Sequence, residues 1–135
     1  MTYISIDGDN IGALLEKFIL QNKKEDLKNI SKTISLCFQS FISKLESEVL
    51  IPIEVIVLGG DTIIIEVNER EITTAINVII KHFSNCPFSV SIGIGASLRE
   101  AYLALKFAKA TGKNKIVIHK DSKFKILAEN ITNHD

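Results

Sequence analysis

The spacing of hydrophobic and polar residues predicts five short strands. Each is a run rich in β-branched residues and bounded by polar or turn-forming residues, which is typical of strands. The runs cover residues 1–6, 53–58, 62–67, 88–95 and 115–119. Gly59, Gly60 and Asp61 separate the second run from the third. This composition predicts a tight hairpin, because glycine supplies the backbone angles that such turns require.

Between these runs, hydrophobic residues recur every three or four positions, as they do on one face of an amphipathic helix. This spacing covers residues 11–19, 25–50, 72–83 and 98–109. Asp9 or Asn10 is expected to cap the first helix, and Pro52 ends the second. Asn68–Glu71 and Ser97–Glu100 have the composition of capping boxes, so they are expected to open the third and fourth helices.

This order of elements predicts an α+β fold. Without one extra helix and a final helix and strand, it is the ferredoxin-like βαββαβ pattern with a mostly antiparallel sheet. In that topology the first strand lies beside the 53–67 hairpin, so Asp7 and Asp61 are expected at the same end of the sheet. We expect one domain over residues 1–120, followed by a polar tail over residues 121–135 that is in part disordered.

Composition excludes several classes of protein. The 135 residues suit one domain, and 16 basic residues balance 16 acidic ones, so strong binding to nucleic acid is not expected. No apolar run approaches the roughly 20 residues of a membrane span, and we expect no membrane association. Cys37 and Cys86 are the only cysteines and form no metal-binding motif. Reduced thiols and a cytoplasmic location are therefore expected.

Two carboxylates are the main candidates for chemistry. Asp7 ends the first strand and Asp61 follows the paired glycines. Two carboxylates that meet at a turn repel each other unless a cation neutralises them, so the pair favours a divalent metal site. Each acid also has an ordinary interpretation, Asp7 as a helix cap and Asp61 as a turn residue. Asp9 lies directly before the helix and fits the capping role better.

Phosphate-binding groups are predicted on both sides of these acids. Gly8, Asn10, Ile11 and Gly12 open a helix whose free amides favour an anion, although a plain helix start is the alternative. Lys109 and Lys113 lie around the end of the last helix. They are either solvated lysines at a helix carboxyl end or a cationic clamp for the terminal phosphates of a nucleotide.

Four strings in this order form a pattern that resembles a known superfamily: SIDGDNIG, VLGGDTIII, SVSIGIGAS and ALKFAKATGKNKIVIH. Together they resemble the GGDEF/palm superfamily of nucleotide cyclases, from Thr2 to His119. The likeness is greatest to the minimal CRISPR polymerase family (mCpol), short relatives of the palm domain in type III CRISPR complexes. The resemblance implies a palm domain, and that family is associated with antiviral defence through cyclic nucleotides that a partner effector senses.

The resemblance also implies roles for individual residues. Asp7 and Asp61 would bind the metal from opposite sides, and the Gly8 carbonyl would be a further ligand. Lys109 and Lys113 match the basic positions that contact the terminal phosphates. The implied nucleotide- and phosphate-binding residues are Gly8, Asn10, Ile11, Gly12, Gly59, Gly60, Thr62, Lys109 and Lys113.

Departures from the GGDEF pattern are informative. Thr62 stands where those enzymes carry a second acid, which weakens the expected second metal site and makes Asp9 a further candidate ligand. Leu15 stands where an asparagine reads guanine in diguanylate cyclases, and leucine makes no such hydrogen bonds. The inhibitory RxxD motif is also absent, with Leu50 and Ile53 in its places. These losses argue against GTP and favour ATP.

The sequence therefore predicts a nucleotidyltransferase that depends on Mg²⁺ or Mn²⁺ and condenses and cyclises ATP into a cyclic di- or oligonucleotide. Because each chain carries one site, a ring of two nucleotides is expected from a two-fold homodimer. The downstream effector is not expected to bind stably. Two alternatives stay open. One is an adenylate cyclase that makes cyclic AMP, and the other is a non-catalytic palm domain that only binds nucleotide.

Overall fold

A six-stranded sheet forms the centre of the computed structural model, which describes residues 1–132 apart from the side chain of Glu48. The strands lie in the order β2-β3-β1-β4-β5-β6, and neighbours are antiparallel except for β4 and β5. Their bounds are β1 (Thr2–Gly8), β2 (Ile53–Gly59), β3 (Thr62–Val67), β4 (Val90–Gly95), β5 (Lys115–Lys120) and β6 (Lys123–Glu129). The predicted α+β, ferredoxin-like fold is confirmed, since β1 to β4 have its strand order.

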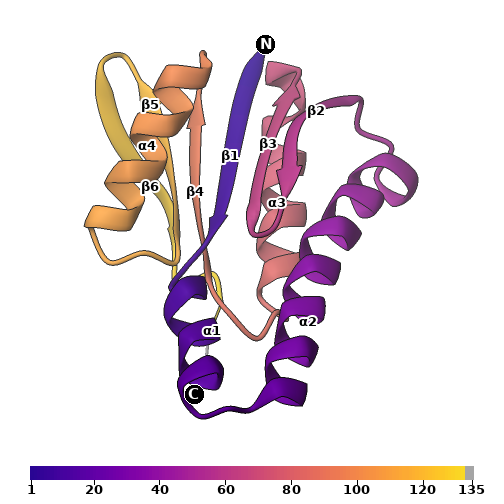
Figure 1. Cartoon of the computed structure of the whole chain (residues 1–135). Coiled ribbons are helices and arrows are strands. Elements are labelled where there is room, and N and C mark those ends of the chain that lie inside the picture. The colour runs from indigo at the N-terminus through magenta and orange to yellow at the C-terminus, as the bar shows by residue number, and fades with distance from the viewer. Residues whose placement is uncertain (133–135) are drawn as a thin grey trace.

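Four helices accompany the sheet: α1 (Ile11–Leu20), α2 (Lys24–Ser43), α3 (Ile72–Phe83) and α4 (Leu98–Ala110). The helix predicted over residues 25–50 is in fact α2 followed by a π-helical turn, η1 (Lys44–Glu48), and a 3₁₀ turn, η2 (Glu69–Glu71), precedes α3. Figure 1 shows α4 in front of the β4–β6 part of the sheet, α3 behind its other half, and α1 and α2 extending beyond its lower end. Within the described part of the chain, no helix has both the length and the apolar character of a membrane span.

Each face of the sheet has its own hydrophobic cluster. On the face covered by α2 and α3, Phe83 packs against Phe38 and Phe41 with ring centroids 5.5 and 5.2 Å apart. The isoleucines of β1, β3 and β4 complete this main core. On the opposite face, the small residues Ala104 and Ala108 of α4 lie on Val117 of β5.

Glycines in β4 fix the position of α4. A Cβ atom at Gly93 would lie 2.2 Å from the carbonyl oxygen of Ala101, so no side chain fits between this strand and the helix. The start of α4 is the predicted capping box. The Glu100 amide donates to Ser97 Oγ, and the Ala96 amide donates to the Glu100 carboxylate, each at 3.1 Å. The helix is therefore held at both its start and its packed face, and this places its carboxyl end beside the end of β1.

The start of α1 differs from the prediction. Asn10 occupies the cap position in the left-handed region at φ 57°, which asparagine tolerates, and its side chain makes no cap hydrogen bond. The capping role predicted for Asp9 is wrong, because its carboxylate points into the protein and bonds to residues of other elements.

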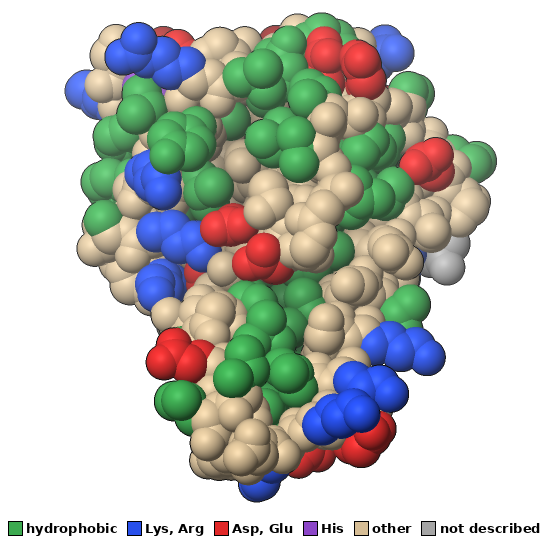
Figure 2. Space-filling view, viewed as in Figure 1, with side chains coloured by type: hydrophobic (Ala, Val, Ile, Leu, Met, Phe, Trp, Pro, Cys, Tyr) green, Lys and Arg blue, Asp and Glu red, His purple; other side chains and the backbone are tan. Residues whose placement is uncertain are grey.

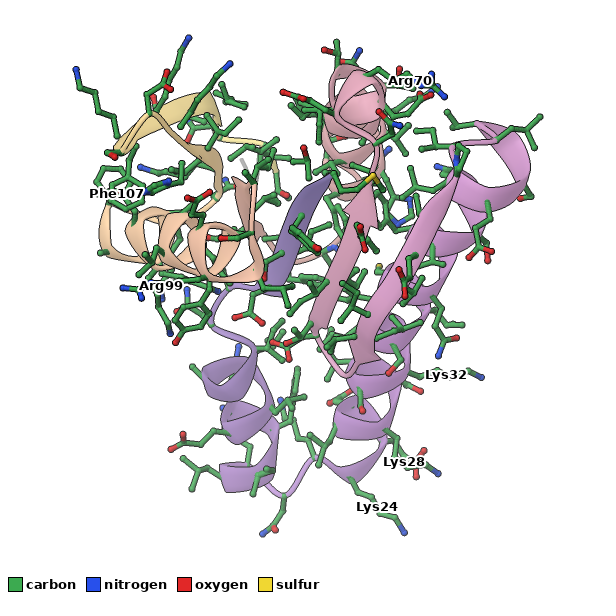
Figure 3. All side chains as sticks on the ribbon, turned by 90° about the horizontal axis from the view of Figure 1, so that it is seen from above. Lys24, Lys28, Lys32, Arg70, Arg99 and Phe107 are labelled. Carbon is green, nitrogen blue, oxygen red and sulfur yellow. The ribbon has the colours of Figure 1, made fainter. Side chains whose placement is uncertain are left out.

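The segment after β5 contains a strand that the sequence analysis did not predict. Asp121 and Ser122, at φ 52° and 59°, form the tight turn that joins β5 to β6. Phe124 of β6 stacks on Phe107 of α4 with ring centroids 4.6 Å apart, which explains the docking of this strand. Figure 3 shows Phe107 on the side of α4 that faces β5 and β6. Beyond β6, Thr132 bonds to Asn114. Residues 133–135 of the predicted tail lie outside the described residues.

Candidate active site

The structure brings Asp7 and Asp61 to the same end of the sheet. Asp7 is the cross-strand partner of Thr62, and the Gly8 amide donates to the Asp61 carbonyl oxygen at 2.9 Å. A Cβ atom at Gly8 would lie 2.6 Å from the Ile11 side chain and 3.2 Å from the Asp61 Cβ atom. Glycine at this position therefore allows the β2–β3 turn to approach the end of β1.

The two acids influence each other electrostatically. Burial raises the pKa of Asp61, the negative charge of Asp7 raises it further, and a backbone hydrogen bond and the charge of Lys109 partly oppose this rise. Thr62 Oγ1 donates to Asp7 Oδ1 at 2.8 Å, which fixes the orientation of that carboxylate. Thr62 thus contacts the first acid through a hydroxyl and adds no negative charge. A cation beside Asp7 and Asp61 would relieve their repulsion.

Asp9 is a buried anchor. Its side chain is 1% exposed. It accepts hydrogen bonds from Ser89 Oγ at 2.6 Å, Ser91 Oγ at 2.7 Å, Lys109 Nζ at 2.8 Å and the Asn114 amide at 3.0 Å. Burial alone would raise the pKa of Asp9, but the hydrogen bonds from Lys109, Ser89 and Ser91, together with the charge of Lys109, lower it overall. Both of its oxygens therefore already have partners.

Lys109 reaches back from α4 to the end of β1. Its ammonium donates to the Gly8 carbonyl and to Asp9 Oδ1, each at 2.8 Å, and it lies 3.4 Å from Asp7 Oδ2. Lys113 lies farther out and donates to Asn10 Oδ1 at 2.5 Å. Figure 2 shows acidic and basic side chains next to each other in the middle of this face. The predicted grouping of two acids and two lysines is thus present as a cluster.

The glycines and amides of the predicted phosphate site surround this cluster. Ile11 begins α1, Gly12 is exposed, and a Cβ atom at Gly12 would meet nothing within 4 Å. Gly60 has a φ of 59° in the β2–β3 turn and follows Gly59, the last residue of β2. Space is therefore open around the Cβ positions of Gly12, Gly59 and Gly60. Phosphate binding by these residues and by Thr62 stays a prediction.

The donor atoms at this end of the sheet suit a divalent cation such as Mg²⁺. The carboxylates of Asp7 and Asp61 and the carbonyl of Gly8 are hard oxygen ligands. Among residues 1–132, no group of three or more histidine, cysteine, aspartate or glutamate side chains could hold a metal. Mg²⁺ commonly uses only one or two carboxylates and completes its shell with water and substrate phosphates. The residues present therefore fit a metal that binds together with a phosphorylated substrate.

Hydrophobic side chains lie next to this cluster. Leu14, Leu15 and Phe18 of α1 are half-buried, and Leu15 packs against the main core. Figure 2 shows a strip of hydrophobic side chains between α1 and α2, directly below the charged cluster. Selection of a base by Leu15 remains a prediction.

Sequence reasoning missed three residues of this site, Ser89, Ser91 and Asn114. Ser89 and Ser91 alternate along the strand of residues 88–95, so the sequence already indicated that they share one face. Their partner Asp9 is 80 residues away in the chain, and only the fold identifies it.

Comparison with known proteins agrees with the fold. The model of the mCpol family, the minimal CRISPR polymerase domain, matches residues 3–119. A chain from the crystal structure of a Csm1–Csm4 cassette in complex with cA4 superposes with a TM-score of 0.74 and 17% identity. That match covers 88% of this chain and 21% of the other, so this chain spans about a fifth of its length.

Two bacterial cyclase structures are also similar. One is a diguanylate cyclase/phosphodiesterase from Caldicellulosiruptor saccharolyticus, with a TM-score of 0.61, 19% identity and coverage of 92% of this chain and 78% of that one. The other is the active GGEEF domain of a diguanylate cyclase from Vibrio cholerae, with a TM-score of 0.58, 22% identity and coverage of 90% and 83%. No match is found among curated proteins.

Proposed function

Because this chain belongs to the minimal CRISPR polymerase (mCpol) family, we propose that it is a metal-dependent nucleotidyltransferase that condenses and cyclises ATP. The supporting observation is the cluster at the end of β1, where Asp7 and Asp61 lie beside Lys109. A domain with the fold of nucleotide cyclases thus carries acidic and basic groups where a triphosphate would react.

In the proposed reaction, a ribose hydroxyl of one ATP attacks the α-phosphate of another. A phosphodiester bond forms, the bond to the β-phosphate breaks, and pyrophosphate leaves. Asp7, Asp61 and the Gly8 carbonyl would hold Mg²⁺ or Mn²⁺. Such an ion lowers the pKa of the attacking hydroxyl and stabilises the charge on the α-phosphate.

The other residues of the site bind and orient the substrate. The amides of Asn10, Ile11 and Gly12 lie at the start of α1, where the helix dipole favours phosphate. Lys113 and Lys109 would hold the departing pyrophosphate. We assign no side chain as general base, since activation of the hydroxyl by the metal does not require one.

The adenine preference rests on Leu15, whose apolar side chain leaves the polar edge of guanine without partners. Unpaired polar groups are a strong cause of discrimination between bases. Formation of a ring from two nucleotides requires two sites to face each other, which a homodimer with two-fold symmetry provides. We therefore propose a cytoplasmic homodimer whose product acts on a separate effector in antiviral defence.

The test is incubation of the purified protein with each nucleoside triphosphate and Mg²⁺ or Mn²⁺. Pyrophosphate release and the mass of the product are measured. We expect release with ATP and a product that contains two or more adenylate units. Asp61→Asn should abolish release. Asp26→Asn removes one carboxylate from the exposed surface of α2 and should not change the rate.

Two other results would replace this proposal. A product with the mass of cyclic AMP would indicate an adenylate cyclase. Nucleotide-dependent thermal stabilisation without pyrophosphate release, over all metals and nucleotides, would indicate a non-catalytic binding domain. Thr62 is the observation that favours this second candidate, because it adds no acid to the pair.

A further inference from the structure

The ammonium group of Lys109 is already held by three oxygen atoms of the protein. An ammonium carries three N–H donors. In this structure it donates hydrogen bonds to the Gly8 carbonyl and to Asp9 Oδ1 at 2.8 Å each, and it forms an ion pair with Asp7 Oδ2 at 3.4 Å. The side chain is only 20% exposed. A triphosphate would therefore compete with these protein oxygens for the N–H donors of Lys109.

Two of these three partners are oxygens that a divalent cation would need. Asp7 and the Gly8 carbonyl line the end of β1 opposite Asp61, and they are among the hard oxygen ligands of the site. A lysine ammonium and a divalent ion are both positive, so they repel each other and compete for the same oxygens. Asp9 differs from these two partners, because its carboxylate is buried behind the lysine. The ion does not require this carboxylate as a ligand, so Asp9 can keep its contact with Lys109 when the ion binds.

We propose that Lys109 is the resident cation of this site and exchanges with a divalent ion. Without the ion, Lys109 neutralises Asp7 and the Gly8 carbonyl. When the ion binds, Lys109 keeps its hydrogen bond to Asp9, leaves Asp7 and the Gly8 carbonyl, and turns its other N–H donors to the phosphates of the substrate. This proposal rests on the proposed function and adds to it that metal and triphosphate bind cooperatively. By linkage, each ligand strengthens the binding of the other by the same factor.

Lys113 provides a matched control. It also carries one positive charge near the end of β1, but its ammonium bonds to Asn10 Oδ1. No ion pair or hydrogen bond of Lys113 with Asp7, Asp9 or the Gly8 carbonyl occurs in the described part of the chain. Its removal lowers the local positive charge as much as removal of Lys109 does, yet it leaves the metal ligands with the same partners.

The experiment is a Mn²⁺ titration followed by electron paramagnetic resonance, without nucleotide, on the wild type, Lys109→Met and Lys113→Met. We expect Lys109→Met to bind Mn²⁺ about tenfold more tightly than the wild type, within the usual range of coupling between two sites. The Mn²⁺ dissociation constant of Lys113→Met should differ from that of the wild type by less than about twofold, because screened surface charges have little effect.

A second variant protects this test against misfolding. Lys109→Met alone leaves the buried Asp9 without its charge partner, which is costly and also makes Asp9 a new metal ligand. The double variant Asp9→Asn with Lys109→Met removes both charges, and it should also bind Mn²⁺ more tightly than the wild type. Inorganic triphosphate serves as a second probe. Mn²⁺ should increase the affinity for inorganic triphosphate in the wild type and in Lys113→Met. The increase should be smaller in the double variant.

Equal Mn²⁺ affinity in the wild type and the double variant would overturn the exchange. If the wild type then still releases pyrophosphate, only this inference fails and the proposed function stands. If the wild type neither binds Mn²⁺ nor releases pyrophosphate, the proposed function fails as well, and the two failures are thereby distinguished.

Discussion

Asp9→Ala removes a buried carboxylate that accepts four hydrogen bonds, from Ser89, Ser91, Lys109 and the Asn114 amide. We expect it to lower the free energy of unfolding by about 3–5 kcal/mol, the usual cost of breaking a buried ion pair. Ser91 is fully buried and Lys109 is 20% exposed, so water cannot fully replace the lost acceptor. Asp9→Asn keeps the size of the side chain and one oxygen acceptor, and it should cost about 1–3 kcal/mol because a hydrogen-bonded charge is lost.

The assay is urea denaturation followed by circular dichroism, with Asp26→Ala as the control. Asp26 is exposed on α2, and its loss should change the free energy by less than about 0.5 kcal/mol. Domains of this size have a free energy of unfolding of about 5–15 kcal/mol, so the expected loss is a large part of it. Asp9→Ala should therefore also lower Tm, by about 10–20 °C. If the free energies of unfolding of Asp9→Ala and Asp26→Ala differ by less than about 0.5 kcal/mol, Asp9 does not anchor these elements.

The pH dependence gives an independent check on the same residue. Although burial raises the pKa of Asp9, its hydrogen bonds and the charge of Lys109 lower it below the ordinary value of 3.8. The carboxylate therefore contributes its full stability above pH 3.8 and loses this contribution as the pH falls through the lower, folded-state pKa. The difference in stability between the wild type and Asp9→Asn should thus shrink below pH 3.8. A difference that stays constant from neutral pH into this range would contradict the reasoning.

Three further predictions concern other positions. Because burial and Asp7 raise the pKa of Asp61, its ionised form destabilises the metal-free fold above pH 3.8, and Asp61→Asn should raise the free energy of unfolding at pH 7 by less than about 1 kcal/mol. A lower free energy of unfolding for Asp61→Asn than for the wild type, measured by urea denaturation, would contradict this prediction. Gly93→Ala places a Cβ atom 2.2 Å from the Ala101 carbonyl oxygen and should lower the free energy of unfolding by about 3 kcal/mol or more. If this variant is as stable as the wild type, α4 lies farther from β4 than described. Burial and the neighbouring Cys37 raise the pKa of Cys86 to about 12. Its thiol should therefore resist iodoacetamide at pH 8 in the native protein and react after unfolding, and rapid native labelling measured by mass spectrometry would refute its burial.

The strands β1 to β5 could be predicted from hydrophobic spacing, because each carries a run of β-branched residues between clear turn or cap signals. The ferredoxin-like topology of these elements then predicts Asp7 and Asp61 at the same end of the sheet. The strand β6 was missed because charged residues interrupt its apolar pattern, as at Lys123 and Lys125. Its position depends on the stack of Phe124 with Phe107, which is a tertiary contact.

The role of Asp9 could not be predicted from its neighbours in the chain. An aspartate before a helix is usually a cap, and local sequence alone favours that interpretation. Here the partners of the carboxylate come from β4 and the residue before it, from α4 and from the turn after α4, 80 to 105 residues away. Burial and a lysine from another element decide the outcome. The contact of Lys109 with the Gly8 carbonyl depends in the same way on the close packing of α4 at Gly93.

We propose that Asp7 and Asp61 share a divalent ion at which a nucleotide reacts. The most direct measurement is an anomalous-scattering map from crystals grown with Mn²⁺ and an ATP analogue that cannot react at its α-phosphate. We predict a manganese peak between these two carboxylates and the Gly8 carbonyl, with the triphosphate against the start of α1. A nucleotide bound elsewhere, with no manganese at the two acids, would contradict the account.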